Sequence, residues 1–264
     1  MSLELFSVAG KVVMITGAGR GIGKIIAEVM AEAKAKVAIC SRTPAELDET
    51  VRAVEALGGE ALAVRADVTK KEDCEAFTAQ TMARFGRIDC LVNNAGGTPA
   101  IKGVLDWTPE EMLDVFHLNL TSAYMLSQMA GRHMIANGQG SIVNISSMAS
   151  VILSRGFLPY SIAKAALNQM SVLMAQELAP KVRVNSLLIG SFSTPASEKT
   201  KLNDIDSWNA MLKNLPLRRQ GDPRCIALTT VFLCSDAASY ITGVPLPIAG
   251  GAPGPVTDFG LPDL

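Results

Sequence analysis

Long hydrophobic runs are missing from this chain, although 48% of its 264 residues are hydrophobic. Gly, Pro and charged residues interrupt every apolar stretch well before the ~18 residues that a membrane-spanning helix needs. The amino-terminal stretch MSLELFSVAG also lacks the basic flank and the apolar core of a signal peptide. We therefore expect a cytoplasmic protein without a membrane segment.

An excess of charge of one sign is missing too. The chain has 24 Lys and Arg residues against 25 Asp and Glu residues. Without a strong net field, nothing in the composition recruits nucleic acid or an anionic membrane. We expect neither as a partner.

Metal-ligating patterns are scarce. The two histidines, His117 and His133, have no carboxylate cluster in the sequence around them, so no metal site is predicted. The cysteines are odd in number and scattered, without the spacing of a zinc site or the density of a disulfide scaffold. They are Cys40, Cys74, Cys90, Cys225 and Cys234. Reduced thiols are the simplest interpretation.

Short runs rich in Val and Ile are what the sequence does contain. They begin at Lys11, Lys36, Ala61, Ile88, Ser141, Val182 and Val244. Such runs suit strands that are buried on both faces, and segments with helical spacing lie between them. In residues 45–59, for example, Leu47, Val51, Val54 and Leu57 share one stripe, and a Gly pair ends the segment.

The alternation of strand and helix predicts a doubly wound α/β fold. We expect a Rossmann-like parallel sheet of seven strands with helices on both faces. The length and the lack of a linker predict a single domain over residues 1–264. Its core would span about 10–251, and the Gly- and Pro-rich residues 252–264 would form an irregular tail.

A glycine-rich loop, TGAGRGIG at residues 16–23, follows the first predicted strand and leads into an apolar helix. Glycines let the backbone turn sharply and let a diphosphate approach the amides at the positive end of that helix. A loop in this context indicates a dinucleotide site. The residues that we assign to it are Gly17, Gly19, Arg20, Gly21, Ile22 and Gly23.

The end of the second predicted strand favours NADP(H) over NAD(H). Many NAD-binding folds have an acid there to hold the ribose 2′-hydroxyl, whereas this chain has Ser41 and Arg42, and no acid before Glu46. Arg42 would pair with the 2′-phosphate, and Arg20 is a second cation of suitable geometry. The alternative is that both arginines are merely solvated.

Five motifs together resemble the short-chain dehydrogenase/reductase superfamily. They are TGAGRGIG, NNAG at residues 93–96, Asn119, ISSMAS, and YSIAK at residues 160–164. The resemblance extends from Gly10 to about Gly251, and residues 215–251 are similar to the end of bacterial ketoreductases. The chain departs from the family at Ile189 and Gly190, where Pro-Gly is usual.

The resemblance implies a catalytic set. Tyr160 would protonate a carbonyl oxygen as hydride arrives, and Lys164, one helical turn away, would favour the phenolate and bind the nicotinamide ribose. Ser147 would hold the substrate oxygen, with Ser146 as a rival that faces the other way on a strand. Asn119 would hold a water that connects Lys164 to solvent. Alone, the Tyr–Lys spacing is commonplace on amphipathic helices.

The resemblance also implies further cofactor contacts. Asp67 would accept a hydrogen bond from the adenine amino group, unless it only forms a turn. Asn93 and Gly96 would line the cofactor, unless their motif mainly steadies the central strands. Ile189 would contact the carboxamide region and Thr194 would hydrogen-bond the carboxamide. The remaining predicted contacts are Val68, Ala95 and Gly190.

The expected activity is NADP(H)-dependent reduction of a ketone to a secondary alcohol. Six residues could form an apolar pocket for an aliphatic, alicyclic or steroid-like ketone, or could be ordinary core. They are Val151, Leu153, Phe157, Phe192, Trp208 and Met211. The alternatives are a 3-oxoacyl-carrier-protein reductase, with Arg132 and Lys181 as docking cations, and a regulator that binds NADP without turnover.

Two apolar helical segments, residues 112–131 and 160–178, predict self-association. They carry more apolar surface than one sheet face needs, and the resemblance implies that they pack against the same pair of another subunit. We expect a homotetramer, with a dimer as second choice. The tail residues Val256, Phe259 and Leu261 would then cross to a neighbouring subunit.

Overall fold

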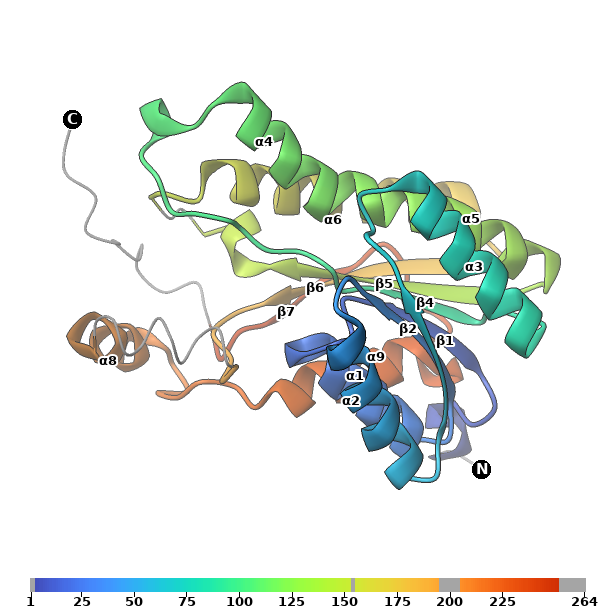
Figure 1. The fold of residues 1–264 in the computed structure, drawn as a ribbon. Coiled ribbons are helices and arrows are strands. Elements are labelled where there is room, and N and C mark those ends of the chain that lie inside the picture. Colours follow the sequence, from blue (N-terminus) through green and yellow to red (C-terminus); the bar gives the residue numbers. More distant parts are fainter. Residues whose placement is uncertain (1–2, 153–154, 195–204, 252–264) are drawn as a thin grey trace.

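A computed structural model describes residues 3–152, 155–194 and 205–251, and Figure 1 shows its fold. Seven parallel strands form one sheet in the order β3-β2-β1-β4-β5-β6-β7. The strands are β1 (Val12–Thr16), β2 (Lys36–Ser41), β3 (Glu60–Arg65), β4 (Cys90–Asn93), β5 (Gly140–Ser147), β6 (Val182–Ile189) and β7 (Pro245–Ile248). Each predicted Val- and Ile-rich run is therefore a strand, and the predicted fold class is confirmed.

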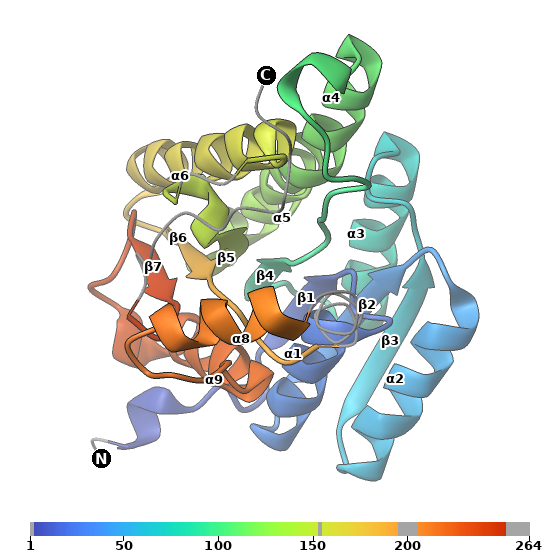
Figure 2. The same cartoon turned by 90° about the vertical axis from the view of Figure 1, so that its left-hand side faces the viewer.

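Helices cover both faces of the sheet, as Figures 1 and 2 show. On one face lie α1 (Gly21–Glu32), α2 (Pro44–Ala56) and α9 (Pro223–Cys234). On the other lie α3 (Lys71–Phe85), α4 (Pro109–Phe116), α5 (Ser122–Ala136) and α6 (Leu158–Leu178). A further helix, α8 (Ile205–Asn214), stands beyond the carboxyl ends of the strands. None of the described helices has the length and apolar character of a membrane span.

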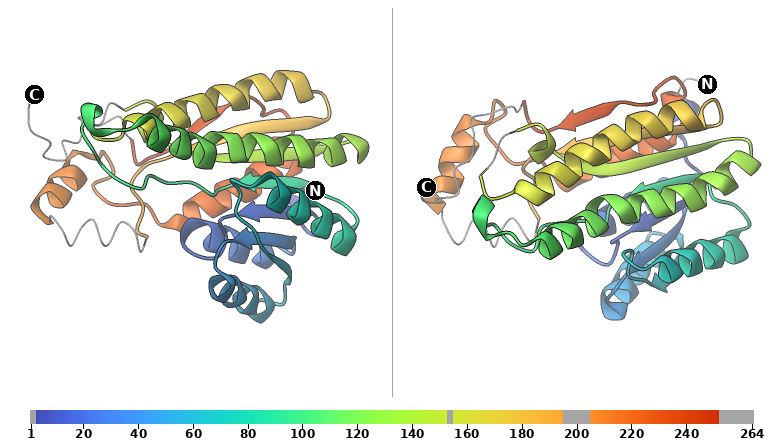
Figure 3. Two further views of the ribbon diagram at one scale, coloured as in Figure 1. Left: turned by 45° about the horizontal axis from the view of Figure 1, so that its top comes forward. Right: turned by 90° about the horizontal axis from the view of Figure 1, so that it is seen from above.

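Short helical segments connect these elements. A π-helical turn, η3 (His117–Thr121), joins α4 to α5, so the three run as one rod beside α6 in Figure 3. The 3₁₀ segments are η1 (Leu3–Phe6), η2 (Val104–Asp106), η4 (Met148–Ser150) and η5 (Asp236–Ala238).

The central strand β1 shows why its sequence is apolar without alternation. Val13 and Ile15 belong to the apolar cluster under α1 and α9, whereas Met14 belongs to the cluster under α3, α5 and α6. Successive strand side chains point to opposite faces, and here both faces are covered.

Helix α2 follows its predicted stripe with one exception. Leu47 and Val54 are buried and Val51 is half-buried, but Leu57 is 38% exposed. The helix has already ended at Ala56, and Gly58 adopts the left-handed φ of 73° that a side chain rarely tolerates.

Candidate active site

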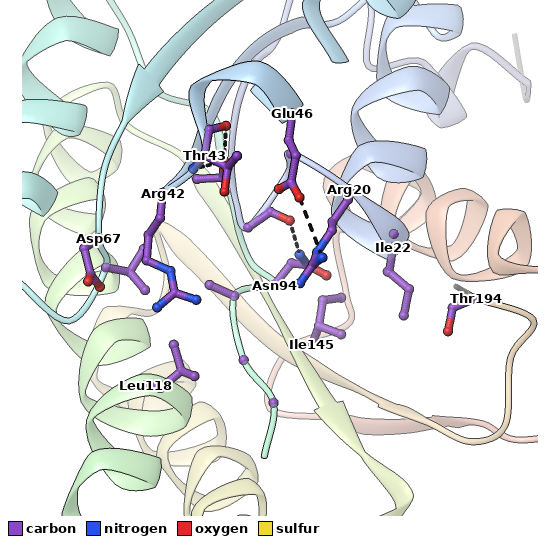
Figure 4. A pocket seen from close by; sticks show the side chains of 18 of the residues that line it. Arg20, Ile22, Arg42, Thr43, Glu46, Asp67, Asn94, Leu118, Ile145 and Thr194 are labelled. Carbon is purple, nitrogen blue, oxygen red and sulfur yellow. Dashed lines mark hydrogen bonds and ion pairs between the residues drawn. The ribbon is translucent and has the colours of Figure 1, made fainter. Parts of the chain in front are cut away.

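A pocket of about 610 Å³ opens at the carboxyl edge of the sheet, where β1 and β4, which flank the reversal of strand order, both end (Figure 4). In open α/β sheets this crevice is where ligands bind. Most residues of the predicted site line it. They are Gly17, Gly19, Arg20, Gly21, Ile22, Ser41, Arg42, Asp67, Val68, Ala95, Gly96, Tyr160, Lys164, Ile189 and Thr194.

The glycine loop suits a diphosphate. Gly21 is the first residue of α1 and has a left-handed φ of 58°, and a side-chain carbon added there would meet no atom within 4 Å. The N-cap residue Arg20 provides no side-chain hydrogen bond to the helix. Amides at the start of α1 are therefore without a side-chain cap beside open space, which is the arrangement that binds phosphate oxygens.

Gly23 and Gly190 lie outside the pocket lining and have packing roles instead. A side-chain carbon on Gly23 would come within 2.5 Å of the Gly17 carbonyl oxygen, so this glycine lets α1 approach the loop. A side-chain carbon on Gly190 would come within 2.8 Å of the Ala249 Cα atom, where the chains leaving β6 and β7 pass each other.

Asn93 lies outside the pocket lining, and its role as a cofactor contact stays a prediction. Its amide nitrogen donates to Asn144 Oδ1 at 2.8 Å and to Ser127 Oγ at 2.9 Å, inside the layer formed with α5. The alternative role of steadying the central strands fits these bonds.

The next residue, Asn94, was not predicted and does line the pocket. Its side-chain nitrogen donates to the Thr16 carbonyl at 2.9 Å and to the Gly17 carbonyl at 3.2 Å. Thr16 Oγ1 in turn accepts from the backbone amides of Asn94 and Ala95, both at 2.9 Å. Asn94 thus ties the end of β4 to the glycine loop. The second Asn of NNAG was the signal available in the sequence.

Ser147 and Tyr160 meet where β5 ends and α6 begins. Ser147 is the last residue of β5, and its side chain lies near enough to the Tyr160 phenol to influence the pKa of that group. Burial raises the pKa of Tyr160, and the Ser147 side chain opposes this rise in part. The phenol therefore stays protonated in the free protein, as a proton donor requires.

Ser146, the rival of Ser147, is among the residues that line the pocket, whereas Ser147 is not. The Ser146 hydroxyl donates to the backbone carbonyl of Lys164 at 3.3 Å and so attaches β5 to α6. Of the two serines, Ser147 is the one whose side chain lowers the pKa of Tyr160.

Lys164 is a buried cation, 3% exposed. Its Nζ atom donates to the Ile145 carbonyl at 2.8 Å and lies 5.7 Å from the centroid of the Tyr160 ring. Burial lowers the pKa of Lys164 to about 8. The side chain that can stabilise a phenolate is thus held next to the phenol.

Asn119 lies in the π-helical turn, 1% exposed and just outside the pocket lining. Its amide nitrogen donates to the carbonyls of Val115 at 2.9 Å and Gly97 at 2.8 Å, and its Oδ1 accepts from the Gly97 amide at 2.9 Å. Such turns are frequent at functional sites. The bulge thus turns Asn119 toward the loop after β4, while its water-holding role stays a prediction.

Gly96 connects Asn119 to Lys164. A side-chain carbon at this position would lie 2.8 Å from Asn119 Oδ1 and 3.1 Å from Lys164 Nζ. Only a glycine lets both groups come this close to the backbone. The NNAG motif therefore lines the pocket and, through the missing side chain of Gly96, leaves room for Asn119 and Lys164.

Asp67 forms a turn and also lines the pocket. Its Oδ1 atom accepts from the Thr69 amide at 3.1 Å and the Thr69 hydroxyl at 2.8 Å. Burial raises its pKa, but the Thr69 bonds and the charges of Arg42 and Lys70 outweigh it and leave the pKa lowered. The turn-forming alternative is thus correct for one oxygen, and the adenine contact stays a prediction.

The residues predicted for an apolar substrate pocket differ in where the structure places them. Phe192 belongs to the core, with its ring against Gly221, so it is not a pocket residue. Trp208 is also buried, whereas Val151 is 59% exposed. The Phe157 ring lies 6.3 Å from the Tyr160 ring between centroids. Leu153 and the side chain of Met211 lie outside the described part of the chain.

Comparisons with known proteins agree with this geometry. A family model described as enoyl-(acyl carrier protein) reductase matches residues 17–252. An uncharacterized oxidoreductase of Mycobacterium tuberculosis is 40% identical over 265 residues, covering 100% of both chains. The 7alpha-hydroxysteroid dehydrogenase of Escherichia coli K12 is 36% identical over 243 residues, covering 92% of this chain and 94% of that protein.

A solved structure of a 7alpha-hydroxysteroid dehydrogenase, complexed with NADH and 7-oxo glycochenodeoxycholic acid, has a TM-score of 0.90 and 34% identity, covering 96% of this chain and 97% of that chain. The chain belongs to the short-chain dehydrogenase/reductase superfamily. It is an oxidoreductase for alcohol and carbonyl groups, in a family that binds a nicotinamide cofactor.

Proposed function

We propose that the protein is an NADP(H)-dependent carbonyl reductase that converts an apolar ketone to a secondary alcohol. The observation that carries the proposal is a single pocket lined by Tyr160 and Lys164, with Ser147 near the phenol, and also by Arg20 and Arg42. The first group handles a carbonyl oxygen, and the second suits a 2′-phosphate.

The side chains divide the proton chemistry among them. The nicotinamide supplies the hydride that reaches the carbonyl carbon. Ser147 holds the carbonyl oxygen, and Tyr160 gives its proton to that oxygen, so the product is an alcohol and a phenolate remains. The Lys164 cation stabilises this phenolate until a proton returns from solvent. Asn119, fixed by three hydrogen bonds beside Gly97, holds a water on that return path.

The choice of NADP(H) rests on Arg20 and Arg42. Both arginines line the pocket, as does Ser41. The two positions at the end of β2, Ser41 and Arg42, contain no acid. Arg42 makes no ion pair with another described residue, so its guanidinium is available to a phosphate. The related 7alpha-hydroxysteroid dehydrogenase structure holds NADH, so membership of the family does not by itself select NADP(H).

An apolar ketone is the substrate class that we favour. Phe157, the residue before α6, has its ring beside that of Tyr160, and Val151, the residue after η4, is 59% exposed. The steroid activity of a relative makes an alicyclic ketone the first compound to try. The thioester alternative has weaker support, because Arg132 and Lys181 lie near the far ends of α5 and α6 from Tyr160.

One assay tests the proposal. NADPH oxidation is followed with a cyclohexanone, a 7-oxo steroid, an acetoacetyl thioester and a crotonyl thioester, with Tyr160→Phe as the inactive control. Turnover of a ketone supports the proposal. Turnover of acetoacetyl thioester alone selects the acyl reductase, and of crotonyl thioester alone an enoyl reductase. Nucleotide binding without any turnover across a wide panel favours the regulator.

A further inference from the structure

A carboxylate lies inside the pocket, next to the cations assigned to the 2′-phosphate. Glu46, in the first turn of α2, lines the pocket, and its Oε1 atom is 3.6 Å from the Arg20 guanidinium. Figure 4 shows the Glu46 side chain pointing toward Arg20. Glu46 thus forms a long, partly exposed ion pair with one of the two arginines.

The carboxylate also occupies a defined space. A side-chain carbon placed on Gly19 would lie 2.8 Å from Ser41 Oγ and 3.0 Å from Glu46 Oε2. Glu46 therefore lies over the glycine loop, beside the hydroxyl of Ser41, the last residue of β2. This is the space to which the 2′ substituent of the adenosine ribose is assigned.

The backbone holds Glu46 in that position. Thr50, one turn further along α2, is fully buried, and its Oγ1 atom is 2.9 Å from the Ala18 carbonyl oxygen and 3.1 Å from the Glu46 carbonyl oxygen. The first turn of α2 is thereby tied to the glycine loop. Side-chain rotation toward solvent remains open to Glu46, whose side chain is 31% exposed.

The two arginines therefore differ in their availability. Arg20 has a carboxylate partner that a phosphate must displace, whereas Arg42 has no ion pair with another described residue. In Figure 4, Arg42 lies apart from the Arg20–Glu46 pair, on the side of Asp67. A 2′-phosphate carries a charge of about −1.5 to −2 and would be repelled by Glu46.

We propose that Glu46 is a specificity-determining residue that substitutes for the 2′-phosphate when the cofactor lacks one. With NADH, Glu46 keeps its pair with Arg20 and can accept a hydrogen bond from the ribose 2′-hydroxyl. With NADPH, the phosphate takes over Arg20 and Glu46 turns out to solvent. This inference rests on the proposed NADP(H) function. Its consequence is a preference for NADPH smaller than two arginines alone would give, and a site that accepts both cofactors.

The test measures dissociation constants by titration of the full-length protein with NADPH and NADH, without substrate. Glu46→Gln keeps the shape and removes the charge, so we expect the ratio of the NADH constant to the NADPH constant to rise about tenfold. Glu49→Gln is the matched control, because Glu49 is an exposed acid of the same helix outside the pocket lining. The control ratio should change less than twofold.

A second pair of probes isolates the phosphate. Binding of 2′,5′-ADP should strengthen about tenfold in Glu46→Gln, while binding of 5′-ADP should weaken or stay unchanged. In the Glu46→Gln background, Arg20→Ala should reduce 2′,5′-ADP affinity more than it does in the parent, since Arg20 is then free of its carboxylate.

The possible failures are distinguishable. Equal ratios in Glu46→Gln and Glu49→Gln, with both nucleotides still bound, would overturn the role of Glu46 and leave the proposed function standing. Glu46 would then only favour the start of α2 through the helix dipole, which a lower melting temperature would reveal. A parent protein that binds neither nucleotide would overturn the proposed function itself.

Discussion

The Nζ atom of Lys164 lies 5.7 Å from the centroid of the Tyr160 ring, one turn further along α6. Burial acts on the two groups in opposite directions, because it raises the pKa of the phenol and lowers the pKa of the ammonium to about 8. Both effects favour the neutral forms. Their proximity counteracts this, since a charged Lys164 stabilises the phenolate that proton transfer produces.

Tyr160→Phe should abolish most turnover and leave nucleotide binding in place. The change removes only the hydroxyl that donates the proton, and general acid catalysis contributes roughly 10²- to 10⁴-fold. We expect kcat to fall at least 100-fold while the NADPH dissociation constant changes less than threefold. Tyr124→Phe, an exposed residue of α5, is the control. A variant that kept more than about a tenth of the rate would remove Tyr160 from this role.

The stability contributed by Lys164 should depend on pH. Its pKa is about 8 in the folded protein and about 10.4 in an unfolded chain, so between these values the unfolded chain binds more protons. Stability from this group therefore rises with pH across that window and is constant below it. Lys164→Met lacks the effect.

Urea unfolding of the parent and of Lys164→Met at pH 7.5 and pH 9.5 measures it. The parent should gain about 2 kcal/mol relative to the variant between the two pH values. Turnover of the variant should be lost at both. Parallel stability profiles would show that Lys164 keeps an ordinary pKa in the folded state.

Gly96→Ala should damage the site without unfolding the protein. The added carbon would lie 2.8 Å from Asn119 Oδ1 and 3.1 Å from Lys164 Nζ, so one of these groups must move. We expect kcat to fall at least tenfold. Gly131→Ala is the control, because its added carbon meets only Leu178 Cδ1 at 3.9 Å within a helix. A Gly96→Ala variant with unchanged kcat would mean that the Asn119 and Lys164 positions are not critical.

The sequence predicted those features that depend on local pattern. The strand runs and the glycine loop follow from neighbouring residues, while Ser147, Tyr160 and Lys164 were implied by the resemblance. The glycine loop, Tyr160 and Lys164 line one pocket at the edge of the sheet. The resemblance implied Asn93 as a cofactor contact, whereas the structure shows Asn94 in the pocket lining. β4 ends at Asn93, whose side chain turns toward α5.

Other features depend on contacts between distant segments. From the sequence, Glu46 is only an acid near the start of a helix. The hydrogen bond from Thr50 to the glycine loop brings Glu46 over Gly19. Phe192 was predicted as a possible substrate contact after β6, but Gly221 leaves room for its ring in the core. Neither outcome follows from hydrophobicity or spacing alone.

Arg42→Asp should reverse the cofactor preference. In the parent, we expect NADPH to exceed NADH in kcat/KM by at least tenfold, since a charge-assisted hydrogen bond contributes roughly 1.5 to 3 kcal/mol and ~1.4 kcal/mol is one decade. The variant removes the unpaired cation and places a repulsive charge near the phosphate. Arg65→Asp, at an exposed position on the end of β3, is the control for net charge. Steady-state kinetics with both nucleotides decide the matter, and a variant that still prefers NADPH would contradict the assignment.

Self-association should involve the face formed by α4, α5 and α6. Leu113, Tyr124, Ile162 and Leu173 of these helices are 57%, 47%, 41% and 53% exposed, and the helices lie side by side in Figure 3. Apolar side chains at this density on one layer favour burial against a second copy, in a twofold arrangement. We expect a homotetramer, with a dimer as second choice.

Leu173→Glu should reduce the mass measured by light scattering at micromolar protein, because it places a charge in the apolar contact. Leu57→Glu, at the exposed end of α2, should leave the mass unchanged. A monomer mass for the parent would refute the assembly, and a Leu173→Glu variant of full size would move the interface to another face.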